Sequence, residues 1–480
     1  MVKQCQNSII LTNLDLVPNN LNALDQDGCT PLHLATDLGV AKLLIKSGCA
    51  VQIPDQNGCT ALHRAASNGC GELVGLLLEA GVDVWAEDKD GWTALDEAAS
   101  RGYYEVAKLL FDVQGGTWKP SSNCWTSLHW AAESGHSKII ELLATDPDKL
   151  LIKDAKAWQP LHWAASNGHI CAVETLLLRG ASDVEQDQQG RTPSHIAAIE
   201  GHAKVLDLLR NVQMQDSAGQ TPLHLASLNG HVESVDALLK RQVSVDQIDA
   251  EGRTAMHCAA ARGHENVLRS LLNARANVEI ADKSDRTPLH LAAQHGHAGV
   301  SRSLLEHRAN PHAQDTQLAT PLHLAAANGH TETVKFLLGG MKEVNLLDRS
   351  GRTALHLAAA RGYMGIVKLL IERGIDTNKP NKRGWTALHF SAGNGQFEIV
   401  ELLLEGSRSR KLSKDGCGLS PLDWAVLNDH PTVLAILLSQ LSVDAFPFED
   451  QENALRIAEE NKHGRSAELI RLWRVQRQVS

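Results

Sequence analysis

Apolar residues recur along this chain in short segments of two alternating kinds. One kind carries a leucine and then a pair of alanines, as in LHWAA at 161–165. The next kind carries larger side chains, as in VETLL at 173–177. Both follow the i, i+3, i+4 spacing that aligns side chains on one face of an α-helix. The pattern predicts pairs of amphipathic helices, of which the first has a thin face that lets a neighbouring helix come close.

The helix pair repeats along the chain with a fixed period. Each first helix starts with a variant of the tetrapeptide TPLH, and these variants begin at 30, 60, 93, 126, 159, 192, 221, 254, 287, 320, 353, 386 and 420. Nine of the twelve intervals between them equal 33 residues. One helix pair cannot bury its apolar face alone, whereas stacked pairs form a continuous core. The period therefore predicts an array of stacked units.

Each unit has recognisable start, stop and turn residues. The Thr or Ser of the tetrapeptide can cap the first helix through its hydroxyl, and Pro is tolerated in the first turn. Gly135, Gly168 and Gly201 stand where the first helix should end in a left-handed conformation. An Asp opens the turn to the next unit, because its carboxylate can bond the backbone that follows it. This Asp recurs as Asp55, Asp88, Asp154, Asp187, Asp216, Asp249, Asp282, Asp315 and Asp348.

These motifs together resemble the ankyrin repeat family over roughly residues 20–475. The TPLH variants, the alanine pair, the Gly-His step, the Leu-rich second helix and the period all occur in the same units. The resemblance implies an all-α, ankyrin-type solenoid of helix pairs with β-turn fingers, with about 13 full repeats and degenerate end units. We expect a degenerate first unit at 1–28, the array at 29–452, and a degenerate capping unit and tail at 453–480.

Residues 124–136, CWTSLHWAAESGH, raise the question of a metal or acid–base site. His129, Glu133 and His136 have the i, i+4, i+7 spacing of one helix face. A helix that stops at Gly135, however, does not keep His136 on that face. Both histidine positions also recur in the other units, and the resemblance implies that the tetrapeptide histidine bonds the Thr and nearby backbone. We interpret them as structural.

Composition and motif searches argue against an enzyme. The net charge is −10, the nine cysteines form no CxxC pair, and no run of eighteen apolar residues occurs. No P-loop, dinucleotide fingerprint, GxSxG or HExxH motif is present. We therefore predict no catalytic residue, no cofactor and no metal. We expect an intracellular protein, cytoplasmic or nuclear, with no nucleic-acid partner and no membrane insertion, and we read the basic insertion at 405–416 as a solvated loop.

The residue immediately before the tetrapeptide varies in an informative way. It is Trp92, Trp125, Trp158 and Trp385 in four units, and Arg191, Arg253, Arg286 and Arg352 in four others. Because a core position would not hold Trp and Arg interchangeably, we interpret this position as surface, and in ankyrin proteins it lies on the concave face that touches partners. Trp130 and Trp163 share a second position, where Leu is usual. An alternative for the Trp row is stacking of successive rings on one another.

We predict that these ten Trp and Arg residues bind a protein partner with an apolar anchor and an acidic segment. The function expected is a non-enzymatic scaffold or adaptor that binds on the concave face. The alternative is a regulatory adaptor such as a transcription co-regulator or a ubiquitin-ligase substrate receptor. The sixth unit is shortened at 206–221, which predicts a weak joint in the array.

Overall fold

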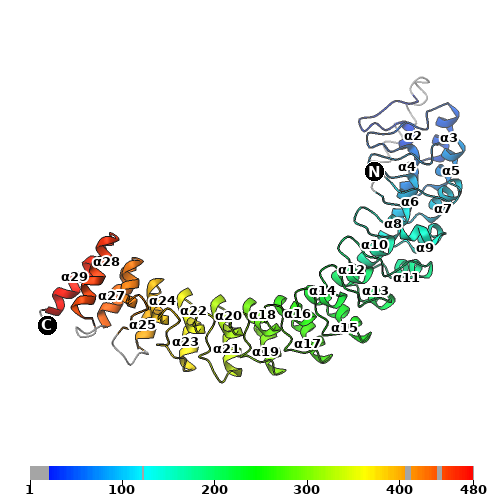
Figure 1. Cartoon of the computed structure of the whole chain (residues 1–480). Helices are drawn as coiled ribbons and strands as arrows, with labels where there is room; N and C mark the ends of the chain where they lie inside the picture. Colours follow the sequence, from blue (N-terminus) through cyan, green and yellow to red (C-terminus); the bar gives the residue numbers. More distant parts are fainter. Residues whose placement is uncertain (1–20, 122–123, 406–411, 441–445, 479–480) are drawn as a thin grey trace. The chain divides into compact units, whose positions relative to one another are not determined.

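The computed structural model describes residues 21–121, 124–405, 412–440 and 446–478, and within these ranges the regular elements are all helical (Figure 1). Each unit starts with a short first helix that follows the tetrapeptide Thr, Ser or Gln. The first helices are α2 (Pro31–Leu34), α4 (Ala61–Ser67), α6 (Ala94–Arg101), α8 (Ser127–Glu133), α10 (Pro160–Ser166), α12 (Pro193–Glu200), α14 (Pro222–Asn229), α16 (Ala255–Arg262), α18 (Pro288–His295), α20 (Pro321–Asn328), α22 (Ala354–Arg361), α24 (Ala387–Gly393) and α26 (Pro421–Leu427).

A second helix follows each first helix after a short step. The second helices are α3 (Leu38–Lys46), α5 (Gly71–Glu79), α7 (Tyr104–Val113), α9 (Ser137–Leu143), α11 (Ile170–Leu178), α13 (Ala203–Leu208), α15 (Val232–Lys240), α17 (Glu265–Asn273), α19 (Ala298–Glu306), α21 (Thr331–Gly340), α23 (Met364–Glu372), α25 (Phe397–Glu405) and α27 (Pro431–Gln440). A 3₁₀ turn, η1 (Pro147–Leu151), follows α9. The predicted helix pairs are thus confirmed.

The ends of the array differ in how much of them is described. Residues 1–20 of the predicted first unit lie outside the described residues, as do residues 406–411 of the basic insertion. At the other end a longer pair, α28 (Phe448–Glu460) and α29 (Gly464–Gln478), packs on α26 and α27. This last pair begins at Phe448, five residues before the boundary expected from sequence.

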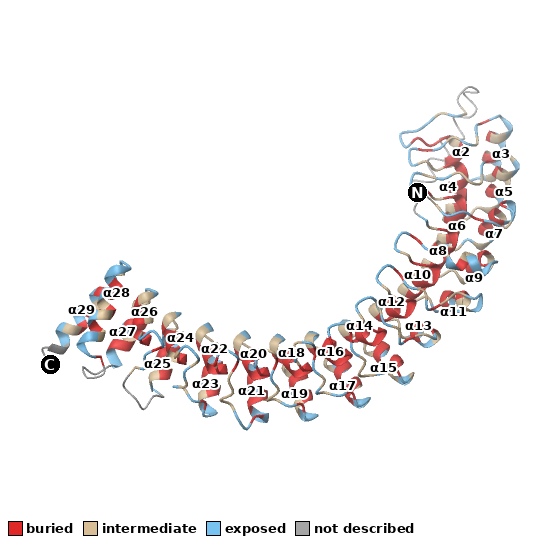
Figure 2. Cartoon of the chain, viewed as in Figure 1, coloured by how far each residue is buried: buried red, intermediate tan, exposed pale blue. Residues whose placement is uncertain are grey.

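The chain divides into two compact halves: the N-terminal half, residues 1–226 with 233–244, and the C-terminal half, residues 227–232 with 245–480. Within each half, first helices pack on neighbouring first helices and second helices on second helices, as α4 on α6 and α5 on α7 do. Figure 2 shows the buried positions running along the helices where they face each other. The alanine pair is fully buried, with Ala164 and Ala165 at 0% exposure, because only a small side chain fits between first helices this close together.

The Gly-His step joins neighbouring units by close contact. Gly168 follows the end of α10 and has φ 70°, a left-handed conformation that suits glycine. A Cβ at this position would lie 2.5 Å from Nδ1 of His202 in the next unit. The glycine is therefore required twice, by its own backbone conformation and by the imidazole that lies against it. The predicted left-handed stop is confirmed.

The Asp turns form the fingers that connect units. In the finger 187–191, Oδ1 of Asp187 accepts hydrogen bonds from the backbone N–H groups of Gln189 and Arg191, both at 2.8 Å. Adjacent fingers also meet through the backbone, since the N–H of Lys89 donates to the carbonyl of Asn57 at 2.9 Å. The carboxylate therefore fixes the shape of the turn at Asp187, as the sequence predicts.

The shortened sixth unit has its own replacement contacts. Helix α13 ends at Leu208, and the carboxylate of Asp183 accepts from the backbone N–H groups of Arg210 and Asn211 at 2.6 and 3.0 Å. The Arg241 guanidinium donates to the carbonyls of Leu206 and Leu209. Asp183, which lies between α11 and α12, and Arg241, which follows α15, thus satisfy backbone groups that a full-length helix would have bonded internally.

Candidate partner-binding face

The tetrapeptide histidines are structural joints. In His257, Nδ1 accepts the backbone N–H of Thr254 at 3.1 Å and lies 2.9 Å from the Thr254 hydroxyl. An Nδ1 that accepts a backbone N–H carries no proton, so the proton is on Nε2. Nε2 then donates to the carbonyl of Arg286 in the next unit at 3.0 Å. The same bond to the next unit is made by His33, His63, His129, His162, His195, His290, His323, His356 and His389.

A second set of histidines bonds in the opposite direction. Nε2 of His169 lies 2.9 Å from the carbonyl of Glu133 in the unit before it, and Nε2 of His136 lies 3.1 Å from the carbonyl of Ser100. The ring of His129 is occupied by Thr126 and by the carbonyl of Trp158. Residues 124–136 therefore serve three different joints, and no group of three or more metal-ligand side chains is assembled anywhere in the described ranges.

Burial governs the protonation of these joints. Desolvation lowers the pKa of His129, His162, His257 and His356 to about 4, against a smaller opposing effect of the carbonyl that each Nε2 donates to. A protonated ring would also place an Nδ1–H against a backbone N–H donor. Both effects favour the neutral imidazole, which suits a bond between units rather than acid–base chemistry at a solvent-exposed site.

Two units replace the histidine with aspartate. Asp96 accepts from the backbone N–H and hydroxyl of Thr93, and it accepts from the hydroxyl of Ser127 in the next unit at 2.6 Å. Asp423 makes the equivalent bonds to Ser420, but its Oδ1 has no hydrogen-bond partner in the part of the chain that the structure describes. Burial raises the pKa of both carboxyl groups. A serine in the following unit therefore compensates for aspartate in one case only.

Five of the tryptophans predicted to bind a partner, those between residues 92 and 163, form one continuous cluster. Ring centroids lie 3.9 Å apart for Trp92 and Trp130, and 4.1 Å apart for Trp130 and Trp125. They lie 4.6 Å apart for Trp125 and Trp163, and 4.7 Å apart for Trp163 and Trp158. The rings alternate between the two positions singled out in the sequence. Direct packing between rings of the same row is thus replaced by packing through the second row, a combination that the sequence interpretation did not foresee.

The exposure of this cluster differs from the sequence expectation. Trp158 is buried, with 9% of its surface exposed, and Trp92, Trp125, Trp130 and Trp163 are half-buried. The interpretation of this position as surface is therefore wrong for Trp158. Its indole N–H donates to Oδ2 of Asp187 at 3.0 Å, and its ring contacts Trp163 and the Lys156 ammonium. Alanine at this position would remove packing and a buried hydrogen bond.

The arginines of the same row are already paired. Each guanidinium donates to the Asp four residues earlier, with Nε–Oδ2 distances of 2.9 Å for Arg253 and 2.8 Å for Arg352. Arg191 and Arg286 make the same bond to Asp187 and Asp282. Burial opposes ionisation of these carboxyl groups, yet the arginine and backbone donors hold the pKa of Asp187 and Asp282 below the ordinary value. The arginines thus hold fingers in place and have only their remaining N–H groups for a partner.

A shared task explains why Trp and Arg alternate at one position. Both are N–H donors, and both reach Oδ2 of a finger aspartate: Arg191 reaches that of its own finger, and Trp158 reaches that of the next. Trp385 does the same with Asp415 at 2.9 Å, and Trp424 at the second position joins it at 3.0 Å. The inference of a surface position from variability was incomplete, because Trp158 and Trp385 share with the arginines a bond to a finger carboxylate. A finger Asp paired with a nearby donor would have been the signal.

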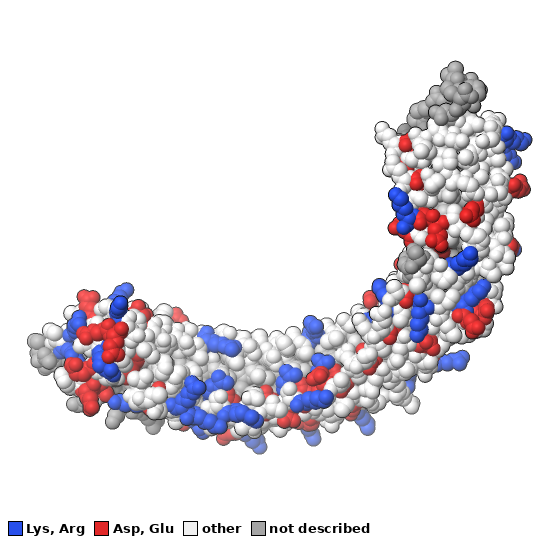
Figure 3. Space-filling model, turned by 45° about the horizontal axis from the view of Figure 1, so that its top comes forward, with Lys and Arg blue, Asp and Glu red and all other residues white. Residues whose placement is uncertain are grey.

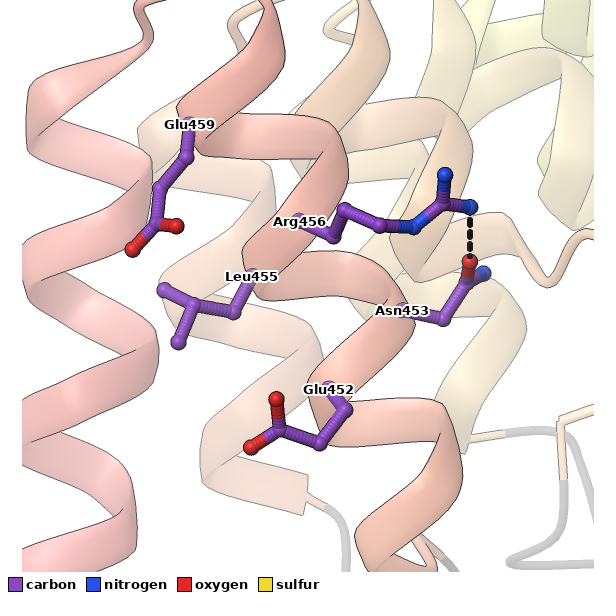
Figure 4. A pocket seen from close by; sticks show the side chains of 5 residues that line it. All are labelled: Glu452, Asn453, Leu455, Arg456 and Glu459. Atoms are coloured by element: carbon purple, nitrogen blue, oxygen red, sulfur yellow. Dashed lines mark hydrogen bonds between the residues drawn. The ribbon is translucent and has the colours of Figure 1, made fainter.

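The thiols of Cys29 and Cys59 and a hollow on α28 do not have the surroundings of a reactive site. Cys29 and Cys59 are free, and each sulfur faces the carboxylate of the next finger. Burial, helped by Asp55 and Asp88, raises the pKa of Cys59 to about 12, so it stays a thiol. Figure 4 shows five residues of α28 that line a hollow, among them Arg456, whose guanidinium donates to Oδ1 of Asn453. A lining from one exposed helix face does not enclose a ligand.

A known protein family matches the repeats along most of the chain. The model for ankyrin repeats, in sets of three copies, matches overlapping segments at 2–88, 40–119, 70–154, 113–186, 161–249, 243–315, 311–381 and 376–447. The chain belongs to the ankyrin repeat family. Ankyrin repeats are in general protein–protein interaction modules, and proteins built from them are typically not enzymes. No curated protein matches the chain closely enough to be counted as a relative. No helix in the described ranges of this ankyrin repeat protein has the length and apolarity to cross a membrane.

Proposed function

We propose that this ankyrin repeat protein is a non-enzymatic scaffold or adaptor that binds a protein partner on the side of the stack formed by the first helices. The anchor of the partner lies on the tryptophan cluster Trp92, Trp125, Trp130, Trp158 and Trp163. The arginines Arg191, Arg253, Arg286 and Arg352, together with Trp385, extend the contact. The partner has an apolar anchor and an acidic segment, and the binding surface takes neither a cofactor nor a metal.

One observation carries this proposal. Four rings of the cluster, in three successive units, keep part of their surface exposed while packing tightly against one another. Rigid, half-exposed Trp rings are typical of interface hot spots, because they bury a large apolar area with little loss of conformational freedom. Folding alone does not demand them at the second position, since Leu291, Leu324 and Leu357 stand there in other units.

The proposed role as an adaptor leaves two kinds of setting open. A plain scaffold holds its partners together, whereas a regulatory adaptor, such as a transcription co-regulator or a ubiquitin-ligase substrate receptor, also engages a regulatory machine. The second setting needs an additional docking surface besides the tryptophan cluster. The cellular site expected from sequence, cytoplasm or nucleus, belongs to the same proposal.

The test replaces Trp130 and Trp163 with leucine, the residue that this position usually holds. W130L/W163L removes two half-exposed rings but keeps a side chain that fits the stack. Proteins captured from cell extract by the wild type and lost with the variant are identified, and the partner is purified and titrated. We expect affinity to fall by about 2 kcal/mol or more, roughly thirtyfold.

The matched control is W424L, which makes the same change at the same position of a later unit. Its affinity should stay close to that of the wild type, although loss of the bond to Asp415 lowers its stability. Full affinity of W130L/W163L for a partner that binds the wild type, with both proteins folded, would place the binding surface elsewhere.

A further inference from the structure

The C-terminal half carries three exposed, positively charged side chains that form no ion pair with the described residues. Arg349 lies in the finger 348–352, and Lys382 and Arg383 lie in the finger 381–385. All three side chains are exposed, and none of them forms an ion pair with any residue in the described ranges. By contrast Arg352, in the same finger as Arg349, is bonded to Asp348. Figure 3 shows Lys and Arg side chains gathered on this part of the chain. We call Arg349, Lys382 and Arg383 the basic fingertip surface.

Backbone bonds hold these cations in register. The N–H of Lys382 donates to the carbonyl of Ser350 at 3.1 Å, which joins the two fingers edge to edge. The N–H of Arg349 donates in the same way to the finger before it, and the carbonyl of Arg383 accepts from Gly416 in the finger after it. Arg349 and Lys382 therefore occupy the same position in consecutive turns. Their side chains project from a connected row of backbone and not from independent loops.

A substitution at the base of the second finger increases the positive charge. Asn381 stands where neighbouring fingers have Asp348 and Asp415. Its Oδ1 still accepts from the backbone N–H groups of Arg383 and Trp385, both at 2.9 Å. The turn is thus built without a carboxylate, and the negative charge that would offset Lys382 and Arg383 is missing. Nothing in the fold explains this accumulation of unpaired positive charge on a protein with net charge −10.

We propose that the basic fingertip surface binds an extended acidic segment of a partner protein. Stacked repeats place equivalent residues about 8–10 Å apart. A chain in the polyproline II conformation rises about 3.1 Å per residue with three residues per turn, so carboxylates three residues apart lie on one face about 9 Å apart and match consecutive fingers. Arg383 adds a planar donor fork suited to a carboxylate or phosphorylated side chain. The three residues are separate from the tryptophan cluster but share their fingers with Arg352 and Trp385, so the inference deepens the function proposed above. The peptide test below and the W130L/W163L test can fail independently of each other.

The same surface suits single-stranded nucleic acid less well. Such binders stack bases on exposed aromatic rings along a basic groove. Here the nearest indole, that of Trp385, donates to Asp415 and packs against Trp424 with centroids 4.5 Å apart. The ring is half-buried and engaged by its neighbours. The charge is therefore available to a polyanion without the stacking platform that bases require.

The test uses the full chain and a fluorescein-labelled synthetic peptide with glutamate at every third position and Gly and Ser between. Binding is followed by anisotropy at about 50 mM and about 300 mM salt. We expect saturable binding that weakens as salt rises. R349E/K382E/R383E should weaken binding at least about tenfold, and R349Q/K382Q/R383Q should weaken it in the same direction but less.

The matched control is K42E/K46E/K108E, which reverses the charge of three exposed lysines in the N-terminal half and changes the net charge by the same amount. It should bind the peptide as the wild type does, and circular dichroism should show all variants folded. Equal loss with both reversed triplets would reduce the effect to net charge and overturn the proposal. So would the absence of saturable binding, or tighter binding of an oligothymidine of equal charge than of the peptide.

Discussion

At the scale of single residues, the accepting Nδ1 of the tetrapeptide histidine decides how units are joined. With Thr254 donating to Nδ1, the proton of His257 is on Nε2 and points to the next unit. The imidazole thus links a helix cap to a neighbouring finger in one side chain. Zinc has no free ring nitrogen to bind at such a joint, so we do not expect added zinc to raise the stability.

The histidine joints make stability depend on pH in a defined window. The pKa of His257 is about 4 in the folded protein and about 6.5 when it is unfolded. Between these values the unfolded chain binds more protons, so the free energy of unfolding falls as pH falls. The stabilisation is complete above about pH 6.5 and is lost progressively towards about pH 4. Each such joint loses on the order of 3 kcal/mol, against a total stability of about 5–15 kcal/mol for a domain.

The measurement is the urea midpoint from about pH 7.5 to about pH 4.5. We expect a marked fall for the wild type and a shallower fall for H257Q, which cannot titrate at that joint. H257Q should also be less stable at neutral pH by about 1–3 kcal/mol, because it leaves buried partners without hydrogen bonds. A midpoint that stays constant across this range would show that the histidines do not titrate differently on unfolding.

At the scale of elements, the shortened sixth unit tests how a missing turn is compensated. Helix α13 has six residues where α11 has nine. Asp183 and Arg241 bond the backbone groups that the shortening leaves free. These contacts depend on two side chains, whereas a complete helix uses its own backbone. The segment should therefore open more readily than the equivalent segments of neighbouring units.

Native-state hydrogen exchange measures this opening. We expect amides in 211–220 to exchange faster than those of the corresponding segments at 179–191 and 241–253. D183N should accelerate exchange there further, since it removes the charge that accepts from Arg210 and Asn211. Equal protection across the three segments would mean that Asp183 and Arg241 fully replace the missing turn.

At the scale of the whole molecule, the chain is a row of units that bond mainly to their neighbours. Stability in such arrays is close to a sum of terms for each repeat and each interface. The division into two halves falls within α14 and α15, immediately after the shortened sixth repeat. A weak interface at this place would let the two halves unfold at different denaturant concentrations.

Equilibrium unfolding, followed by tryptophan fluorescence and by circular dichroism, tests whether the two halves unfold separately. Seven of the ten tryptophans lie in the N-terminal half and three in the C-terminal half, so the fluorescence of the wild type is weighted to the N-terminal half. We expect its fluorescence midpoint to differ from the midpoint measured by circular dichroism. Coincident transitions for both probes would indicate one cooperative array.

The sequence by itself determined the repeating part of this protein. Helix starts, left-handed glycines and Asp turns depend on bonds within a few residues, as Thr254 with His257 and Asp187 with Arg191 show. Such bonds follow from local residue types and spacing, so the helix pair, the period and the structural histidines could be predicted. The ankyrin resemblance rested on the same local features.

Only the tertiary structure decided what the variable residues contact. Trp158 and Asp187 are 29 residues apart, and stacking of the units brings them to hydrogen-bond distance. The same stacking buries Trp158 and inserts Trp163 between it and Trp125. Arg191 and Arg352 pair with finger carboxylates, whereas Arg349 and Lys382 form no ion pair with any residue that the structure describes. Spacing along the chain does not encode which donor reaches which carboxylate, because that choice depends on side chains that adjacent units bring together.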